Sequence, residues 1–352
     1  MATYNGQLHA NKVLASLYNM ILTQYVSGKV VEGLFTELRD SAVEEVGLYG
    51  DTKLFYLPQL LKSYEWEGDA ANLLAVSRPE NPYCQAITID TYRQVMVSLD
   101  SYCSKQAWAS EGAFTTFHSV MKAQLENTKR VEETGIVNVF VGTTVSPKAA
   151  QNIELTVGSG ETIGQKLAEE IANLEIELKD LNRLNDLEYA RAYNPSDIRI
   201  VISSAFANKI KKLEMPAIFH DDAIGELFSK AKVLPAKYFG TVNPASKTTA
   251  DAKTRVIEEC DVGGSHYYPG DKLPTGTTIA ASGSITVPTY QEDANVICKV
   301  MMKDSVVMLS AFTVSTSFFN AKSLIDNTYI TWGRSEPAYI LDKPFITIKK
   351  TA

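Results

Sequence analysis

Apolar residues recur at intervals of three and four over residues 10–26, 104–134 and 162–187. This spacing is typical of amphipathic helices. Another helix is expected over 31–45, and Gly135 is expected to cap the helix that precedes it. The pattern therefore predicts two helices near the start of the chain and two longer ones in its middle.

Residues 52–101 show no helical periodicity and have the texture of a two-sided β-ribbon. In its last part, the apolar side chains of Val95, Val97 and Leu99 alternate with polar ones. Two prolines within 78–82 favour an extended backbone there. A ribbon of this kind cannot bury enough apolar surface to be stable alone, so we expect it to pack against something else, such as another subunit.

The rest of the chain mixes strands with a few helices. A short helix is predicted over 203–213 and another over 223–231, and 241–289 is expected to form loops with short strands. The order of these elements favours an α+β fold over a repeated βαβ array. Strands are predicted at 136–141, 152–157, 198–202, 296–302, 305–314, 329–332 and 343–348.

Charge and composition exclude several classes of protein. With 34 basic and 41 acidic residues the net charge is −7, which argues against a basic nucleic-acid-binding surface and against binding to anionic membranes. Four cysteines are too few and too scattered for a disulfide scaffold. The sequence shows neither a signal peptide nor an apolar run long enough to span a membrane, so we expect a protein kept in a cytoplasm with reduced, buried thiols.

The loop Gly158–Gly164 lies between a predicted strand and a predicted helix, where backbone amides can hold a phosphate group. Its glycine spacing fits neither the dinucleotide fingerprint nor the P-loop, which also requires a lysine. Thr162 is a good helix N-cap residue, so a structural turn is the better interpretation. Phosphate binding stays open as an alternative.

The remaining candidate groups favour structural roles. His220, Asp221 and Asp222 are residue types that bind metals, but three consecutive residues do not converge on one ion. Asp221 or Asp222 is expected instead to cap the helix over 223–231, and His266 to be a surface or packing residue. Glu132 and Glu133 are expected to be solvated on a polar helix face, and Cys84 and Cys103 to be buried thiols. We therefore expect no catalytic residue, no metal site and no cofactor.

Taken together, the order of elements resembles that of a tailed-bacteriophage major capsid protein, the HK-ninety-seven fold. It is most similar to short-tailed podoviruses of the phi-twenty-nine type. The resemblance covers nearly the whole chain and rests on element order and on the texture of several segments. These are 102–108 and 127–131 of the long helix, and 195–202, 213–221 and 233–240 of the mixed region.

The resemblance implies an α+β fold in five parts. Residues 1–51 would be an N-terminal arm, here partly helical where many relatives have an extended arm. Residues 52–101 would be the E-loop ribbon, and 102–142 the P-domain with its spine helix. Residues 143–294 would form a mixed A-domain, and 295–352 strands that return to the P-domain.

It also implies a structural, non-enzymatic protein that assembles into an icosahedral head around packaged double-stranded DNA. Partners would be further copies of the chain in hexamers and pentamers, with portal, scaffolding and decoration proteins. The protein would be assembled in the host cytoplasm and reside in the virion. DNA would be enclosed without sequence-specific binding.

Tyr64, Trp66 and Arg78 of the ribbon are the candidate intersubunit contacts, because aromatic and arginine side chains are enriched at interface hot spots. Packing within their own subunit is the other interpretation of these residues. Two rival functions remain: an encapsulin-like cargo shell, and a cytoplasmic α/β enzyme that binds a phosphorylated ligand at 158–164.

Overall fold

The computed structural model describes residues 34–46, 52–63, 65, 76, 78–100, 111–159, 162–209, 231–244, 246–281 and 284–351. The helix predicted at 10–26 lies outside the described residues, as does the helix predicted at 223–231 except for its last residue. The same holds for Cys103 and for His220 with its two aspartates.

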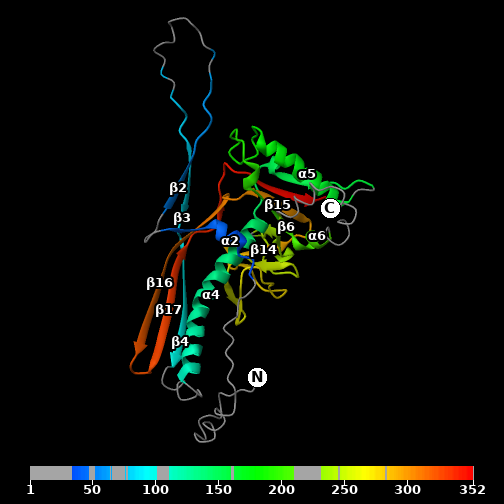
Figure 1. Ribbon diagram of the computed structural model, residues 1–352. Coiled ribbons are helices and arrows are strands. Elements are labelled where there is room, and N and C mark those ends of the chain that lie inside the picture. Colours follow the sequence, from blue (N-terminus) through cyan, green and yellow to red (C-terminus); the bar gives the residue numbers. More distant parts are fainter. Residues whose placement is uncertain are drawn as a thin grey trace.

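A long helix, α4 (Glu111–Thr143), runs through the centre of the molecule (Figure 1). It continues through Gly135 and through 136–141, so the predicted cap and the predicted strand are both wrong. The β-branched run has strand propensity, but Val137 and Val139 are fully buried there. A helix that is buried on all sides needs no polar face, and its tertiary contacts override the local preference.

The first half of α4 lies on one face of a twisted sheet in the order β1–β16–β17–β4, with β18 also paired to β16. Their contact is a small apolar cluster of Leu125, Ile330 and Trp332 with Val95 and Val97 beside them. The pairing of β4 with β17 extends over ten residues. The strands are β1 (Val43–Val46), β4 (Thr91–Asp100), β16 (Val306–Asn320), β17 (Ile325–Arg334) and β18 (Ala338–Tyr339).

A second sheet, in the order β5–β19–β15–β6–β7, forms the centre of the compact lobe. Helix α5 (Ile163–Lys179) covers one of its faces, and the end of α4 packs with the other. Every residue of β15 is therefore buried. The strands are β5 (Asn152–Leu155), β6 (Ile198–Ser203), β7 (Lys232–Leu234), β15 (Val296–Met302) and β19 (Phe345–Lys350), and α6 (Ser204–Lys209) follows β6.

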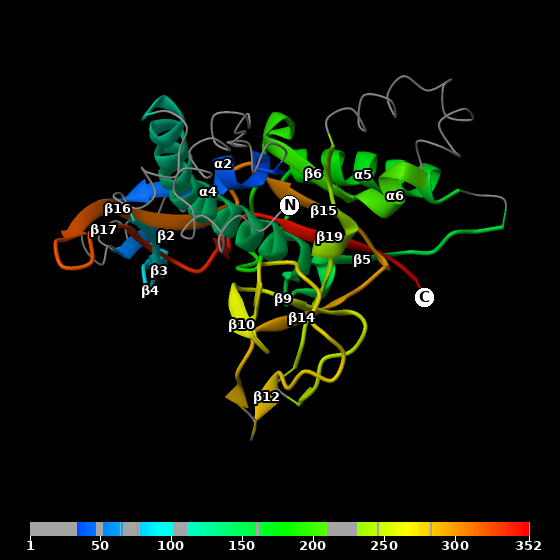
Figure 2. The same ribbon diagram turned by 90° about the horizontal axis from the view of Figure 1, so that it is seen from below.

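Residues 240–292 form a small β-rich lobe that projects away from the side of the molecule carrying α2, α4 and α5 (Figure 2). It contains a three-stranded sheet in the order β8–β14–β9 and two short hairpins. Val256 and Leu273 lie in its own apolar cluster. The strands are β8 (Gly240–Val242), β9 (Thr254–Val256), β10 (Cys260–Val262), β11 (Ser265–Tyr267), β12 (Ala280–Ala281), β13 (Ser284–Ile285) and β14 (Thr289–Glu292).

The remaining described elements are short. Helix α2 (Glu37–Ala42) packs beside α4, and it is shorter than the helix predicted over 31–45 because β1 follows it directly. Strands β2 (Thr52–Leu57) and β3 (Tyr83–Thr88) pair only with each other, as an antiparallel hairpin. Single 3₁₀ turns occur at Ala149–Gln151, Pro195–Asp197 and Ala236–Tyr238.

Candidate functional site

The β2–β3 hairpin stands apart from the compact lobe, while the β4–β17–β16 sheet extends in the opposite direction (Figure 1). Only one side of the hairpin is packed against its own chain. Leu57 and Ile87 are buried there, in a cluster that includes Leu309 and Ile340. The expected ribbon is therefore anchored at one end, and β4 belongs to the sheet that α4 covers.

The other side of the hairpin is apolar and exposed. Leu54 and Tyr56 point outward with 47% and 62% of their surface accessible, and their cross-strand neighbours are Ala86 and Cys84. Cys84 is exposed, so the prediction that it is a buried thiol is wrong. A contiguous apolar face on a two-stranded ribbon marks a surface that another molecule covers.

The hairpin continues beyond β2 through 58–63 and returns through 78–82. Leu60 and Leu61 are exposed in this part, and Lys62 pairs with Glu80 at 3.3 Å. Arg78 is exposed and makes no ion pair within the described part of the chain. The other two predicted contact residues, Tyr64 and Trp66, lie outside the described residues.

A second exposed apolar surface lies on the sheet face opposite α4. Tyr92, Met96 and Phe318 are each about 60% accessible, and Met96 faces Tyr329 across the strands. Beyond Ala311, the outer edge of β16 has no partner strand among the described residues. An open strand edge with apolar side chains is a surface that proteins normally cover or pair.

Two ion-pair groups link α4 to its surroundings, and sequence reasoning missed both. Glu132 and Glu133 are completely buried, so the prediction that they are solvated is wrong. The carboxylate of Glu132 accepts a hydrogen bond from Nε of Arg334 at 3.3 Å, and Arg93 lies at 3.4 Å. Burial raises the pKa of the Glu132 carboxyl, and the guanidinium of Arg334 opposes the rise.

Glu133 binds a different element, the short helix α2. Arg39 donates to its Oε2 from Nε at 3.0 Å and from Nη2 at 2.7 Å, and Ser310 of β16 donates to Oε1 at 3.1 Å. Two adjacent glutamates thus connect the helix to different elements on two sides. No sequence signal distinguishes them from a solvated pair, because the arginines that bind them lie 39 to 202 positions away.

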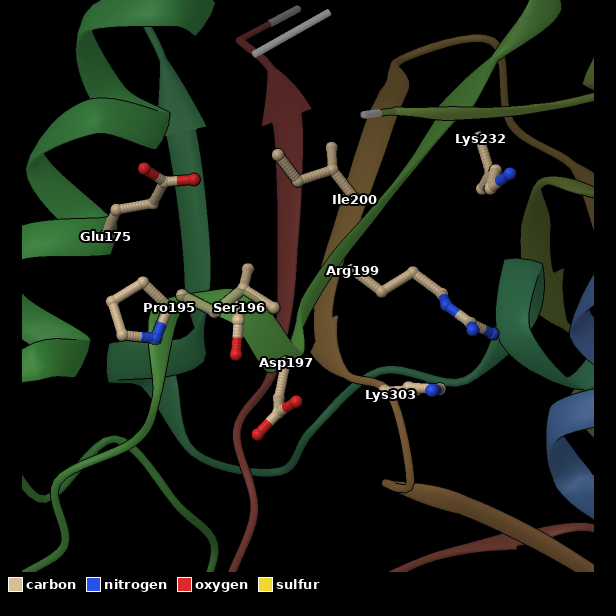
Figure 3. Close-up of a pocket in the computed structure, with 9 residues that line it drawn as sticks. Glu175, Pro195, Ser196, Asp197, Arg199, Ile200, Lys232 and Lys303 are labelled. Carbon is tan, nitrogen blue, oxygen red and sulfur yellow. The ribbon is translucent and has the colours of Figure 1, made fainter. Parts of the chain in front are cut away.

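A hollow of about 590 Å³ lies between the end of α5, β6 and β7 (Figure 3). Its charged lining comprises Arg199, Lys232, Lys303, Glu175 and Asp197, without a histidine or cysteine. Two of its cations bind α2, because Arg199 donates to Ser41 Oγ at 2.5 Å and Lys232 pairs with Glu37 at 2.6 Å. The hollow therefore lies beside the contact between α2 and the second sheet.

Helix α5, which follows the glycine loop, begins with a capping box. The hydroxyl of Thr162 accepts a hydrogen bond from the Gln165 amide, and the Gln165 side chain accepts one from the Thr162 amide. The predicted N-cap is confirmed, and this capping box occupies backbone donors that a phosphate would need.

His266 is partly exposed and forms hydrogen bonds with Asp261 at 2.7 Å and Glu259 at 2.5 Å.

Two further properties bear on function. Within the residues that the structure describes, no group of three or more histidine, cysteine, aspartate or glutamate side chains could hold a metal ion. No helix in the same part of the chain is both long and apolar enough to cross a membrane.

Solved structures share this architecture. A chain in the capsid structure of Staphylococcus phage Andhra matches with a TM-score of 0.62 at 11% identity, over 96% of this chain and 91% of that chain. A chain in the structure of the head fiber and inner core protein of native bacteriophage P68 matches with 0.60 at 13%, over 93% and 89%. No protein-family model and no curated protein matches the sequence.

At these identities the likeness concerns the fold alone. It confirms the predicted α+β fold, the HK-ninety-seven fold of tailed-phage capsid proteins. The narrower resemblance to the phi-twenty-nine type stays a prediction.

Proposed function

We propose that this chain is the major structural subunit of an icosahedral phage head that encloses packaged double-stranded DNA. The observation that carries the proposal is the β2–β3 hairpin, which buries one side against its own chain and leaves an apolar side uncovered. The shared fold with a chain from a phage capsid structure supports it. The protein would be a structural component of the virion without enzymatic activity.

We assign the parts of that fold as follows. The β2–β3 hairpin is the E-loop, and α4 with the β4–β17–β16 sheet is the P-domain. The sheet that contains β15 and β19, with α5 and the projecting lobe, is the A-domain. This assignment differs from the sequence-based division, because β4 moves to the P-domain and two C-terminal strands move to the A-domain.

The hairpin would lie over a neighbour's spine helix and P-domain. Its outward side, with Leu54 and Tyr56, would cover apolar side chains such as Met96 and Phe318 of the neighbour. Burying one such side chain contributes about 1.5–3 kcal/mol, and the contact is repeated at every subunit boundary of a shell. Tyr64, Trp66 and Arg78 extend the proposed contact beyond this apolar side.

The net charge of −7 suits a subunit that encloses DNA without gripping it. Other copies in hexamers and pentamers would be the main partner. Portal, scaffolding and decoration proteins would complete the particle.

Electron microscopy of the purified protein tests the proposal, with and without a co-expressed scaffolding protein. We expect closed, uniform shells in at least one of the two preparations. A protein that stays monomeric in both, and that small phosphorylated ligands stabilise, would refute the proposal and favour the enzyme alternative. Shells that contain a specific protein cargo would favour the encapsulin-like alternative.

A further inference from the structure

The β2–β3 hairpin is held at its base by the side chain of Gln85 on β3. Its Nε2 donates to the carbonyl of Tyr339 at 2.9 Å, and its Oε1 accepts from the amide of Leu341 at 3.1 Å. One side chain thus makes a donor and an acceptor contact with the same extended segment, as a neighbouring strand would. The amide of Gln85 therefore fixes both the distance and the angle between the hairpin and that segment.

Arg191 holds the hairpin at a second point. Its Nη2 donates to the carbonyl of Pro58, the residue that directly follows β2, at 2.5 Å. The same guanidinium pairs with Asp342 at 3.3 Å, next to the segment that Gln85 binds. Arg191 is itself held in place by two backbone hydrogen bonds with Asn182. Both contacts therefore connect the hairpin to residues 339–342.

Residues 339–342 are in turn fixed to the compact lobe. The amide of Asp186 donates to the carbonyl of Leu341 at 3.0 Å, and the hydroxyl of Tyr193 donates to the carbonyl of Asp342 at 2.6 Å. The only other polar contact between the hairpin and the described remainder of its chain is the ion pair of Lys53 with Glu44.

Small changes at this base have large effects further along the hairpin. Beyond Pro58, five extended residues reach Ser63 over a distance of about 17 Å. A tilt of about 10° at Pro58 would move that end by about 3 Å. A shift of this size exceeds what a hydrogen bond or a packed side chain tolerates.

We propose that Gln85 and Arg191 are positioning residues that fix the direction of the hairpin in the free subunit, before a second copy binds. Because the direction is set in advance, binding does not have to order the hairpin, and less free energy is lost on assembly. The effect on assembly rests on the proposed function, but the direction of the hairpin can be measured without assembly.

The first experiment measures that direction in the unassembled protein. Spin labels are attached at Lys62→Cys on the hairpin and Lys179→Cys at the end of α5, with the four native cysteines replaced by alanine. We expect Gln85→Ala and Arg191→Lys to broaden the distance distribution, or to shift it by about 3 Å or more. Arg191→Lys keeps the charge, but the shorter lysine side chain withdraws the donor from the two oxygens that Nη2 of Arg191 reaches.

Gln94→Ala on β4 is the matched control for this measurement, because it removes the same kind of side chain from an exposed hydrogen bond with Thr331 on β17. The labelled protein that carries Gln94→Ala should give the same distance distribution as the labelled protein without this substitution. Distributions for Gln85→Ala and Arg191→Lys that also remain unchanged would overturn the inference, whether or not the protein forms shells.

The second experiment measures the lowest protein concentration at which shells form. We expect both variants to raise it about tenfold, which corresponds to about 1.4 kcal/mol, while Glu169→Gln on α5, outside the proposed contact surfaces, leaves it unchanged. Failure of the unmutated protein to form shells would refute the proposed function and leave the label measurement to decide the positioning role. A threshold that stays unchanged in variants with a broadened distribution would refute the role in assembly.

Discussion

Lys299 lies in the middle of β15 with no accessible surface, and its titration should be visible in the stability of the subunit. Its Nζ donates to the carbonyl of Thr144 at 2.6 Å and to the hydroxyl of Thr347 at 2.8 Å. It forms no ion pair with a carboxylate in the described part of the chain. Burial lowers the pKa of Lys299 from 10.5 to about 7.

Because burial lowers the pKa of Lys299, the free energy of unfolding should increase with pH. Between the two pKa values the unfolded chain holds a proton on Lys299 that the folded chain has released, so the free energy of unfolding rises with pH. Below the folded pKa both states are protonated and the contribution is constant. The whole difference is about 5 kcal/mol, of which about 2 kcal/mol falls between about pH 6 and pH 8.5.

The window ends there because Cys298 acts in the opposite direction at higher pH. Burial raises the pKa of its thiol from 9.0 to about 12. Ionisation of the unfolded thiol would lower the stability of the fold above about pH 9.

Lys299→Met removes the charge and keeps the length of the side chain. It also leaves Thr144 and Thr347 without a donor, which costs about 1–3 kcal/mol at every pH. The informative quantity is therefore the stability of the wild type minus that of the variant, which should increase by about 2 kcal/mol from pH 6 to pH 8.5. Urea unfolding of the unassembled subunit, followed by tryptophan fluorescence, measures it.

Lys303→Met serves as the control, since Lys303 is exposed just beyond the end of the same strand. Its stability should follow the wild type in parallel across the pH range. Parallel curves for Lys299→Met and the wild type would show that Lys299 titrates normally, and would refute the reasoning from burial.

Three further substitutions test other parts of the structure. Glu133→Gln should destabilise the subunit by about 3 kcal/mol in thermal unfolding, because it breaks a buried pair with Arg39. Glu169→Gln at an exposed pair should change the stability by less than about 0.5 kcal/mol, and equal effects of the two substitutions would contradict the burial of Glu133. Gly142→Ala would place its Cβ 2.2 Å from the carbonyl oxygen of Tyr238, so we expect a loss of about 1–3 kcal/mol or more, and near-neutral behaviour of Gly263→Asn in an open turn with φ +60°. Tyr56→Ser should leave the free energy of unfolding of the subunit unchanged within about 0.5 kcal/mol. It should raise the lowest protein concentration at which shells form about tenfold or more, and Thr52→Ser should change neither quantity. A loss of stability in Tyr56→Ser would place that side chain in the subunit core.

The sequence predicted the elements whose pattern is local. The stripe of α5 repeats every three or four residues, and Leu167, Ile171 and Leu174 of that stripe are buried on the sheet as expected. Thr162 begins the helix because its side chain needs only the amide three residues later. Leu181 is exposed, however, because α5 ends at Lys179, earlier than the pattern indicates.

What the sequence could not predict depends on contacts between distant residues. Gly135 was expected to end a helix, yet it lies in mid-helix where a Cβ would come within 2.8 Å of Pro269. A glycine required for close approach and a glycine required for a left-handed cap look the same in a sequence. The same limit applies to Glu132, whose partner Arg334 on β17 is 202 positions away.

The hairpin was recognised as a segment without a core of its own, but its anchorage could not be foreseen. Ile87 and Ile89 are followed by the polar residues Thr88 and Asp90, and this local pattern does not identify the partner of the buried side. That partner includes Leu309 and Ile340, more than 200 residues later. The outward side carries Leu54 and Tyr56, so both sides of the ribbon look apolar in the sequence.

Residues 334–341, from the end of β17 to the turn before β19, contact three parts of the molecule that are far apart in sequence. Arg334, the last residue of β17, binds Glu132 of α4 and, at 3.2 Å, Glu258 of the projecting lobe. A few residues later, Tyr339 and Leu341 bind Gln85 of the hairpin. Because these two residues follow Gln85 by more than 250 positions, the hairpin would not acquire its direction until these later residues are in place. Completion of the subunit fold would thereby be coupled to the presentation of the proposed assembly surface.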